Sequence, residues 1–302
     1  MPKRRTLFLL VILVVAGPLS LPTAEACSIC HCGDPTYSLF GSQIFVPNTW
    51  SFGVDADRYS KDQVGVDDPT LREEENENRI TLSAAYSIRR RVTLIARLPI
   101  ADRTITTETE TLSATGFSDP EFAIHLNALP SRPATFLSAT LGVRTPWGQN
   151  NKQIDGERAE EHVQPGTGAV GANAGLAFSR LLQTNGSLFG SVLGRANGRS
   201  DFGYKYGNAI LANLAYERKL AGRLNGVFEV NYRYAAKDEE KVGETDPNTG
   251  GSVLYLSPKI LVRLDKSQGL FFRIGVQIPV VENLFGDQDE KVNVLTGLTV
   301  RF

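Results

Sequence analysis

The sequence lacks most of the residues from which enzyme and metal centres are made. Among 302 residues there are three cysteines, three histidines and a single methionine, which is the initiator. It contains no Gly-x-Ser-x-Gly stretch, and no serine and histidine stand at a recognisable catalytic spacing. The formal net charge is −1, so the basic excess typical of a nucleic-acid-binding protein is missing as well. We therefore expect neither an enzyme nor a nucleic-acid partner.

Long apolar runs are also missing, except at the start. Basic residues at 3–5 precede an apolar run at 7–15, and the chain then reaches Ala24-Glu25-Ala26. This order is typical of a secretory signal peptide with its cleavage site, so the mature chain is expected to begin at Cys27. A lipoprotein signal is the alternative, because a cysteine follows the cut. No later stretch approaches the ~20 apolar residues of a membrane-spanning helix.

What the sequence has instead is a two-residue alternation of apolar and polar side chains. In the last stretch Val292, Val294, Leu298, Val300 and Phe302 fall on one side, which predicts a β-strand with one apolar face. Similar stretches precede it, with lengths that suit strands crossing a membrane at a tilt. Twelve strands are predicted, at residues 49–57, 79–89, 91–100, 121–128, 134–144, 169–179, 187–195, 208–217, 223–234, 253–264, 270–280 and 292–302.

The predicted connections alternate between short and long along the whole chain. Outer-membrane barrels have short periplasmic turns and longer external loops, and a soluble β-sandwich has no reason to keep this order. In lipid every backbone amide must be paired, and strands achieve this only in a closed barrel. The short turns are predicted near residue 90 and at 129–133, 180–186, 218–222 and 265–269.

The predicted fold class is therefore all-β, a transmembrane antiparallel up-and-down β-barrel of about twelve strands. The C-terminal strand, which ends in Phe302, closes it. Three regions follow: a signal peptide at 1–26, a periplasmic cysteine-containing segment at 27–48 and the barrel at 49–302. An even strand number with short turns beside both ends places both termini in the periplasm.

If the apolar faces meet lipid, the opposite faces line the barrel interior. These faces are polar and carry charges of both signs, with a basic excess in the last four strands. The pattern predicts either a polar pore or an interior sealed by ion pairs, and the sequence leaves both alternatives open. The candidate selectivity residues are Arg97, His125, Arg233, Lys259 and Arg273.

The long connections are rich in acidic residues, at 73–77, 155–161 and 238–246. A calcium site would need a compact geometry that this spacing does not suggest. We interpret the acidic connections as a solvated exterior that divalent ions bridge to lipopolysaccharide.

All three cysteines lie together in Cys27-Ser28-Ile29-Cys30-His31-Cys32. Cys-x-x-Cys-His is a c-type haem attachment pattern, which would make Cys27, Cys30 and His31 the cofactor-binding residues, with His125 or His162 as the distal ligand. The same three residues with Cys32 would alternatively bind a soft metal such as Cu(I) or Zn. A disulfide fits the oxidising periplasm, and a lipid on Cys27 is the fourth alternative. For the main function we expect no cofactor.

Four short motifs in the predicted barrel, which we call landmarks, resemble the motifs of a known protein family. Their order and spacing are similar to those of the outer-membrane transporter family labelled for the MetA pathway of phenol degradation, over residues 49–302. Ser118 replaces the family's second glycine, Arg144 its lysine, and Trp147 interrupts its Pro-Thr-Gly. The N-terminal Cys-x-x-Cys-x-Cys-Gly-Asp-Pro resembles a head found on a subset of such proteins. The landmarks are Leu98-Pro99-Ile100, Gly116-Phe117-Ser118-Asp119-Pro120, Gly142-Val143-Arg144-Thr145-Pro146-Trp147-Gly148 and Gln164-Pro165-Gly166-Thr167-Gly168.

The resemblance implies uptake of small hydrophobic or aromatic molecules through an outer-membrane barrel. The strand that ends in Phe302 also resembles the closing strand of bacterial outer-membrane barrels, which implies recognition by the barrel-assembly machinery. The leading hypothesis is a non-enzymatic channel for passive passage of a small solute, surrounded by outer-membrane lipid and lipopolysaccharide. The alternative is a redox or metal-handling protein that uses the cysteine cluster, with the barrel as anchor or sheath.

Overall fold

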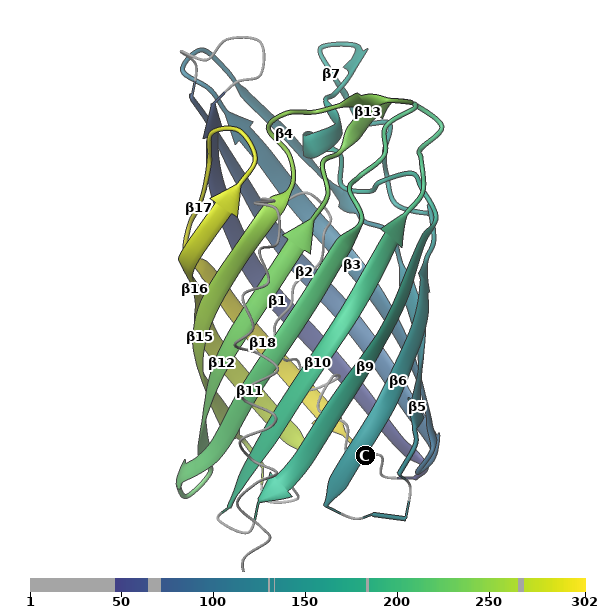
Figure 1. The fold of residues 1–302 in the computed structure, drawn as a ribbon, viewed down its shortest axis with the longest axis vertical. Helices are drawn as coiled ribbons and strands as arrows, with labels where there is room; N and C mark the ends of the chain where they lie inside the picture. The colour runs from purple at the N-terminus through teal and green to yellow at the C-terminus, as the bar shows by residue number, and fades with distance from the viewer. Residues whose placement is uncertain (1–46, 65–71, 130, 133, 183–184, 266–268) are drawn as a thin grey trace, which may run out of the picture.

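The computed structural model describes residues 47–64, 72–129, 131–132, 134–182, 185–265 and 269–302. Its main element is a wall of long antiparallel strands (Figure 1). Each of the predicted strands corresponds to one of them. The wall strands are β1 (Thr49–Val64), β2 (Arg72–Arg89), β3 (Val92–Thr106), β5 (Glu121–Asn127), β6 (Thr135–Arg144), β9 (Gly171–Leu182), β10 (Gly186–Asn197), β11 (Ala209–Ala221), β12 (Leu224–Ala235), β15 (Gly251–Arg263), β16 (Leu270–Leu284) and β18 (Asn293–Arg301).

The wall closes on itself, because β1 pairs with β2 on one side and with β18 on the other. The hydrogen-bonded sheet has fourteen strands, of which β4 (Thr111–Phe117) and β17 (Gln288–Glu290) are short extensions at one end. The remaining twelve form the barrel, which confirms the predicted fold class. At the seam, Trp50 and Phe302 exchange two backbone hydrogen bonds of 2.8 and 3.0 Å.

Large apolar side chains cover the outside of the wall. In β18 the odd and even positions behave as predicted: Asn293 and Leu295 are buried, whereas Val294 and Leu298 are exposed. An exposed apolar face on every wall strand is expected of a barrel whose solvent is lipid. The outward side chains include Phe52, Leu82, Leu94, Ile124, Leu141, Leu176, Val192, Leu214, Phe228, Ile260 and Ile274.

Within the described residues, no helix is long and apolar enough to span a bilayer.

The two ends of the barrel differ as the sequence predicted (Figure 1). Tight turns join strand pairs at the end where β1 begins and the chain finishes; Gly222, with a φ of 50°, sits in one of them. The long connections lie at the other end and carry small elements of their own. These are β4, β7 (Gln153–Ile154), β8 (Glu157–Arg158), the 3-10 helix η1 (Glu161–Val163), β13 (Glu239–Lys241), β14 (Glu244–Thr245) and β17.

The wall reaches further toward the long connections than predicted. The segment 58–78 was expected to be a polar loop with solvated acidic residues, but β1 continues to Val64 and β2 already begins at Arg72. Glu75 and Glu77 are buried inside the barrel, with 1% and 0% exposure. The reason is pairing: Lys61 lies 2.9 Å from Glu75, and Arg103 lies 2.9 Å from Glu77. The prediction of a solvated acidic loop was wrong here.

Candidate functional site

The barrel interior is lined by side chains that alternate with the lipid-facing ones. On β15, Tyr255, Ser257 and Lys259 are almost fully buried, while Pro258 and Ile260 between and beside them are exposed. In a closed wall the buried face is the inner one. The interior is therefore the place to look for a solute path, and its chemistry follows from these inward positions.

Ion pairs join charged side chains on the inner face of the wall. The Glu229 carboxylate lies 2.8 Å from Lys259 Nζ, and the two side chains are 0% and 1% exposed. Arg233 lies 2.6 Å from Glu290, whose second oxygen accepts a 3.1 Å hydrogen bond from Tyr255. Charges buried this well require close partners, because desolvation otherwise costs several kcal/mol per ion.

Further ion pairs involve other parts of the wall. Arg273 on β16 lies 2.9 Å from Asp55 on β1, and Arg195 on β10 lies 2.6 Å from Glu121 on β5. Both pairs connect strands that are not neighbours in the sheet. The opposite charges predicted for the interior therefore pair with one another on the inner face of the wall.

The five candidate selectivity residues do not form one cluster. Arg233, Lys259 and Arg273 lie on β12, β15 and β16 and take part in three separate ion pairs. Arg97 on β3 stands opposite Glu121 in the strand register, and the buried His125 on β5 stands between Thr93 and Thr140 of the flanking strands. They therefore form two groups, one on the consecutive strands β12, β15 and β16 and one on the neighbouring strands β3 and β5.

Two apolar patches also face inward, which the sequence analysis missed. It predicted a polar interior, yet one buried cluster on β9 to β16 and a second on β2, β3 and β5 are entirely apolar. The signal was present, since Val227-Phe228, Leu261-Val262 and Phe271-Phe272 are consecutive apolar residues that break the alternation. The first patch contains Phe189, Ala215, Val227 and Leu261 with Ala177 and Phe271 against it; the second contains Ala85, Ile95 and Ala123.

Loops fill the long-connection end of the barrel. Tyr204 and Tyr206, from the connection between β10 and β11, pack against Tyr59 on β1 and Leu295 on β18. Counting round the closed wall, β10 is the sixth strand from β1 in either direction. A contact between this connection and Tyr59 therefore spans the mouth of the barrel, and the loop crosses it rather than standing above it.

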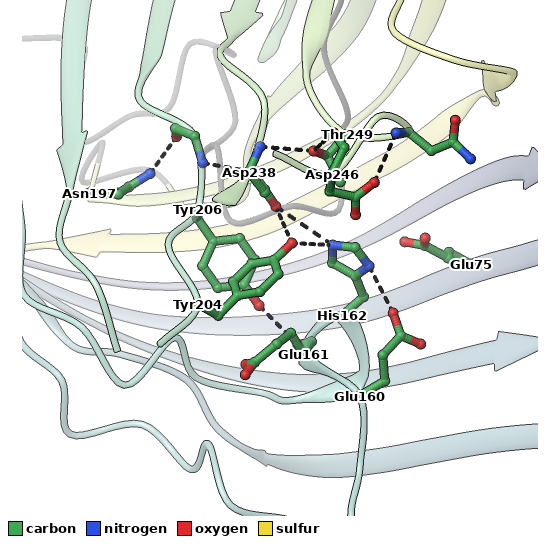
Figure 2. A network of polar contacts seen from close by, with 12 residues as sticks. Glu75, Glu160, Glu161, His162, Asn197, Tyr204, Tyr206, Asp238, Asp246 and Thr249 are labelled. Atoms are coloured by element: carbon green, nitrogen blue, oxygen red, sulfur yellow. Dashed lines mark hydrogen bonds and ion pairs between the residues drawn. The ribbon is translucent and has the colours of Figure 1, made fainter. Parts of the chain in front are cut away.

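The connection between β6 and β9 reaches the same place. His162 in η1 is 5% exposed; its Nε2 lies 3.0 Å from Tyr204 Oη, and its Nδ1 lies 3.1 Å from Glu160 (Figure 2). The Asp238 carboxylate, from the connection after β12, accepts a 2.7 Å hydrogen bond from Tyr204 and lies 3.6 Å from His162 Nε2. Three connections thus meet at one histidine, and we call His162, Glu160, Tyr204 and Asp238 the latch.

The latch is also attached to the wall. Arg103 on β3 donates a 3.1 Å hydrogen bond to the backbone carbonyl of His162, while Val163 packs in a buried cluster with Ile105. Gly207 donates its N–H to the other oxygen of Asp238 at 2.7 Å. The latch is therefore held from several sides of the mouth.

The hydrogen-bond directions require a charged His162. The Tyr204 hydroxyl gives its proton to Asp238, so its oxygen accepts from Nε2 of His162. Nδ1 faces the Glu160 carboxylate and must donate too. Burial alone lowers the pKa of His162, but the Asp238 carboxylate beside Nε2, the hydrogen bond to Glu160 and the negative charge of Glu75 outweigh it and hold this pKa well above 6.5.

The sequence analysis weighed His162 only as a distal haem ligand. Both of its ring nitrogens are engaged in the latch. The cofactor and metal candidates Cys27, Cys30, His31 and Cys32 lie outside the described residues. Among the residues that the structure describes, no group of three or more His, Cys, Asp or Glu side chains is arranged to hold a metal ion.

A solved outer-membrane channel shares this fold. The COG4313 outer membrane channel from Pseudomonas putida F1 is similar with a TM-score of 0.66 and 10% identity, over 85% of this chain and 97% of that one. The translocator domain of the autotransporter NalP from Neisseria meningitidis gives 0.49 and 11%, over 85% and 89%. The CymD monoaromatic hydrocarbon channel gives 0.43 and 9%, over 93% and 94%. At these identities the likeness concerns the fold.

No curated protein matches the sequence. A family model described as "Putative MetA-pathway of phenol degradation" matches residues 79–286, which is well over half of the chain. The match includes all four landmarks on which the resemblance depended. The chain belongs to this family.

Proposed function

We propose that the protein is an outer-membrane channel for passive passage of a small solute. The observation that carries this proposal is a closed barrel with an apolar outside and an interior lined by polar groups and apolar patches. Membership of the family supports it. Each wall strand is hydrogen-bonded to two neighbours, so the wall is rigid and a solute path must run through the interior.

The solute that fits this interior is small and at least partly apolar. The patch around Phe189, Val227 and Leu261 offers an aromatic and aliphatic surface inside the barrel, where a hydrophilic pore would present water-binding groups. In ion pairs such as Glu229–Lys259 the two opposite charges neutralise each other, which leaves little net charge in the interior to select for ions. The family description, which refers to phenol degradation, agrees with an aromatic solute.

The orientation follows from loop length. We place the short turns and both termini in the periplasm and the long connections outside, which suits a chain secreted with residues 1–26 as its signal. Phe302 would then enter the barrel-assembly machinery from the periplasmic side. Exposed acidic residues of the long connections, such as Glu157 and Glu240, would face lipopolysaccharide.

We expect no catalytic activity and no cofactor for passage. The chemical state of the segment with Cys27, Cys30, His31 and Cys32 is independent of passage. The intact mass of the mature protein determines this state. A mass lower by two protons indicates a disulfide. An added haem, metal or lipid would make this segment an active part of the protein.

The test of the channel proposal is uptake by intact cells whose other outer-membrane channels are depleted. Liposomes are unsuitable, because phenol-sized solutes cross phospholipid unaided. Expression of the protein should increase uptake of a small aromatic solute, and Leu261→Asn, which puts an amide into the apolar patch, should reduce this gain. Equal uptake with and without the protein, at matched outer-membrane levels, would contradict the proposal.

A further inference from the structure

Asp119 joins three of the family landmarks. It is 1% exposed and follows β4. One carboxylate oxygen accepts a 3.0 Å hydrogen bond from the Gly148 N–H. The other accepts from the Thr167 N–H at 2.8 Å and from the Thr167 hydroxyl at 2.5 Å, with Arg144 Nε 3.8 Å away. Residues from both ends of the β6–β9 connection therefore meet on one carboxylate.

Close backbone approach completes this joint. A Cβ on Gly148 would lie 2.8 Å from the Cα of Gly166, so only glycine fits there. The Gly166 N–H donates to the carbonyl of Gln149 at 2.9 Å. Residues 149–165 thus form a compact loop with its two ends side by side. We call Asp119, Gly148, Gly166 and Thr167 the clasp.

The clasp and the latch, two of the attachments of this loop, differ in chemistry. A third attachment is apolar, because Ala159 and Val163 pack in a buried cluster with Ile105. The clasp consists of backbone and hydroxyl donors on a carboxylate, none of which changes its charge near neutral pH. The latch at the far end depends on one proton, because both nitrogens of His162 donate to groups that accept. We propose that residues 149–165 are a gate that turns about the clasp and that protonated His162 holds closed across the mouth.

This proposal rests on the proposed channel function, and the groups that face the two ring nitrogens of His162 are acidic or neutral, which favours the protonated ring. Three acidic groups lie near His162: Glu160 on the same loop, Asp238 from the connection after β12, and Glu75 on β2. Tyr204, from the connection after β10, is neutral. Arg103 on β3 donates a hydrogen bond to the backbone carbonyl of His162. Lys61 faces Glu75, and Arg103 also pairs with Glu77.

The direction of the pH effect follows. The pKa of His162 is raised in the closed state, so closure is fully stabilised below the usual histidine pKa and is lost as pH rises through the raised value. Loss of the proton leaves Glu160 and Asp238 facing a neutral ring, which disfavours the closed position.

The first test is planar-bilayer conductance of the full protein as pH is raised from neutrality, staying below the range near 10 where Lys and Tyr titrate. Conductance should rise with pH. His162→Gln, which keeps hydrogen-bonding capacity without the charge, should show a raised conductance already at neutral pH and a flat profile. The open-to-closed ratio should shift by at least about tenfold. Lys241→Gln is the matched control, because it removes an exposed positive charge from the same set of connections.

A second readout does not depend on conduction. Lys152 and Arg158 are the trypsin sites inside the gate, and in the closed state the Arg158 guanidinium carbon lies 3.8 Å from the centre of the Phe202 ring, in the connection between β10 and β11. Cleavage after Arg158, monitored by mass spectrometry, should be faster in the His162→Gln variant and at raised pH, while the strands of the wall stay uncleaved.

The outcomes separate the two proposals. Absence of conductance and uptake under every condition, with pH-dependent cleavage retained, would overturn the channel and keep the moving loop. Conductance and cleavage that are identical in wild type and His162→Gln at every pH would overturn the gate and keep the channel.

Discussion

The wall and the mouth of this barrel use the same interactions with opposite consequences. In the wall, Glu229 and Lys259 face each other from neighbouring strands whose spacing the backbone hydrogen bonds already fix. In the mouth, His162 and Asp238 belong to separate connections, and their contact is what brings those connections together. Loss of a wall pair therefore destabilises a structure that stays in place, whereas loss of a mouth contact releases a segment.

The largest effect is expected in the wall. Glu229→Gln removes the carboxylate that faces Lys259 in the interior, and breaking such a buried pair costs about 3–5 kcal/mol of unfolding free energy. This loss is measured by unfolding the protein in urea. The electrophoretic mobility of heated and unheated samples reports the folded fraction. The double variant Glu229→Gln with Lys259→Met should recover much of the loss, because the Gln carbonyl can still accept from the buried amides of Asn213 and Asn231. A single variant as stable as wild type would remove the distinction between wall and mouth.

A smaller and local effect is expected at the clasp. Thr167→Val deletes the hydroxyl that donates to Asp119 at 2.5 Å but keeps the backbone N–H bond. A hydrogen bond to a charged group contributes about 1.5–3 kcal/mol, so exchange of the gate amides in 149–165 with solvent deuterium should accelerate. The amides of β9 should keep their protection, since the strand pairing does not involve this hydroxyl. Simultaneous loss of protection in β9 would show that clasp and wall are one unit.

The smallest effect is expected for an exposed ion pair of the outer rim. Lys291 lies 2.9 Å from Asp62, pairs with Asp289 as well, and is 39% exposed. Its pKa is raised by the hydrogen bonds to Asp289 and Asp62. Exposed pairs contribute about 0–1 kcal/mol, so Lys291→Ala should leave the urea midpoint almost unchanged. If Lys291→Ala lost as much unfolding free energy as Glu229→Gln, solvent exposure would not explain the difference between the rim ion pair and the wall ion pair.

The wall could be predicted from the sequence because its signal is local. A two-residue period places Val294 and Leu298 outside and Asn293 inside without knowledge of any neighbour. The prediction stopped short at Glu75 and Glu77, since charged residues that face a barrel interior look like a loop in the sequence. The inner apolar patch was missed for a related reason: Phe271 beside Phe272 reads as one apolar stretch, although the two side chains face opposite ways.

The mouth could not be predicted in this way. His162 and Tyr204 are 42 positions apart and come from connections with no periodic pattern. Glycines 148 and 166 were visible as turn signals, but their convergence on Asp119 depends on the fold of the whole connection. Sequence showed that these segments were landmarks, and only the three-dimensional structure shows that they form a joint.

In the proposed channel, residues 149–165 close the mouth together with the connection between β10 and β11 that crosses it. The most direct measurement is the bilayer conductance of a variant in which an Asn-Gly turn replaces residues 150–165, which the bond between Gln149 and Gly166 makes feasible. We expect a larger conductance at neutral pH that no longer changes as pH is raised. A correctly folded variant with the small, pH-dependent conductance of the full protein would contradict it.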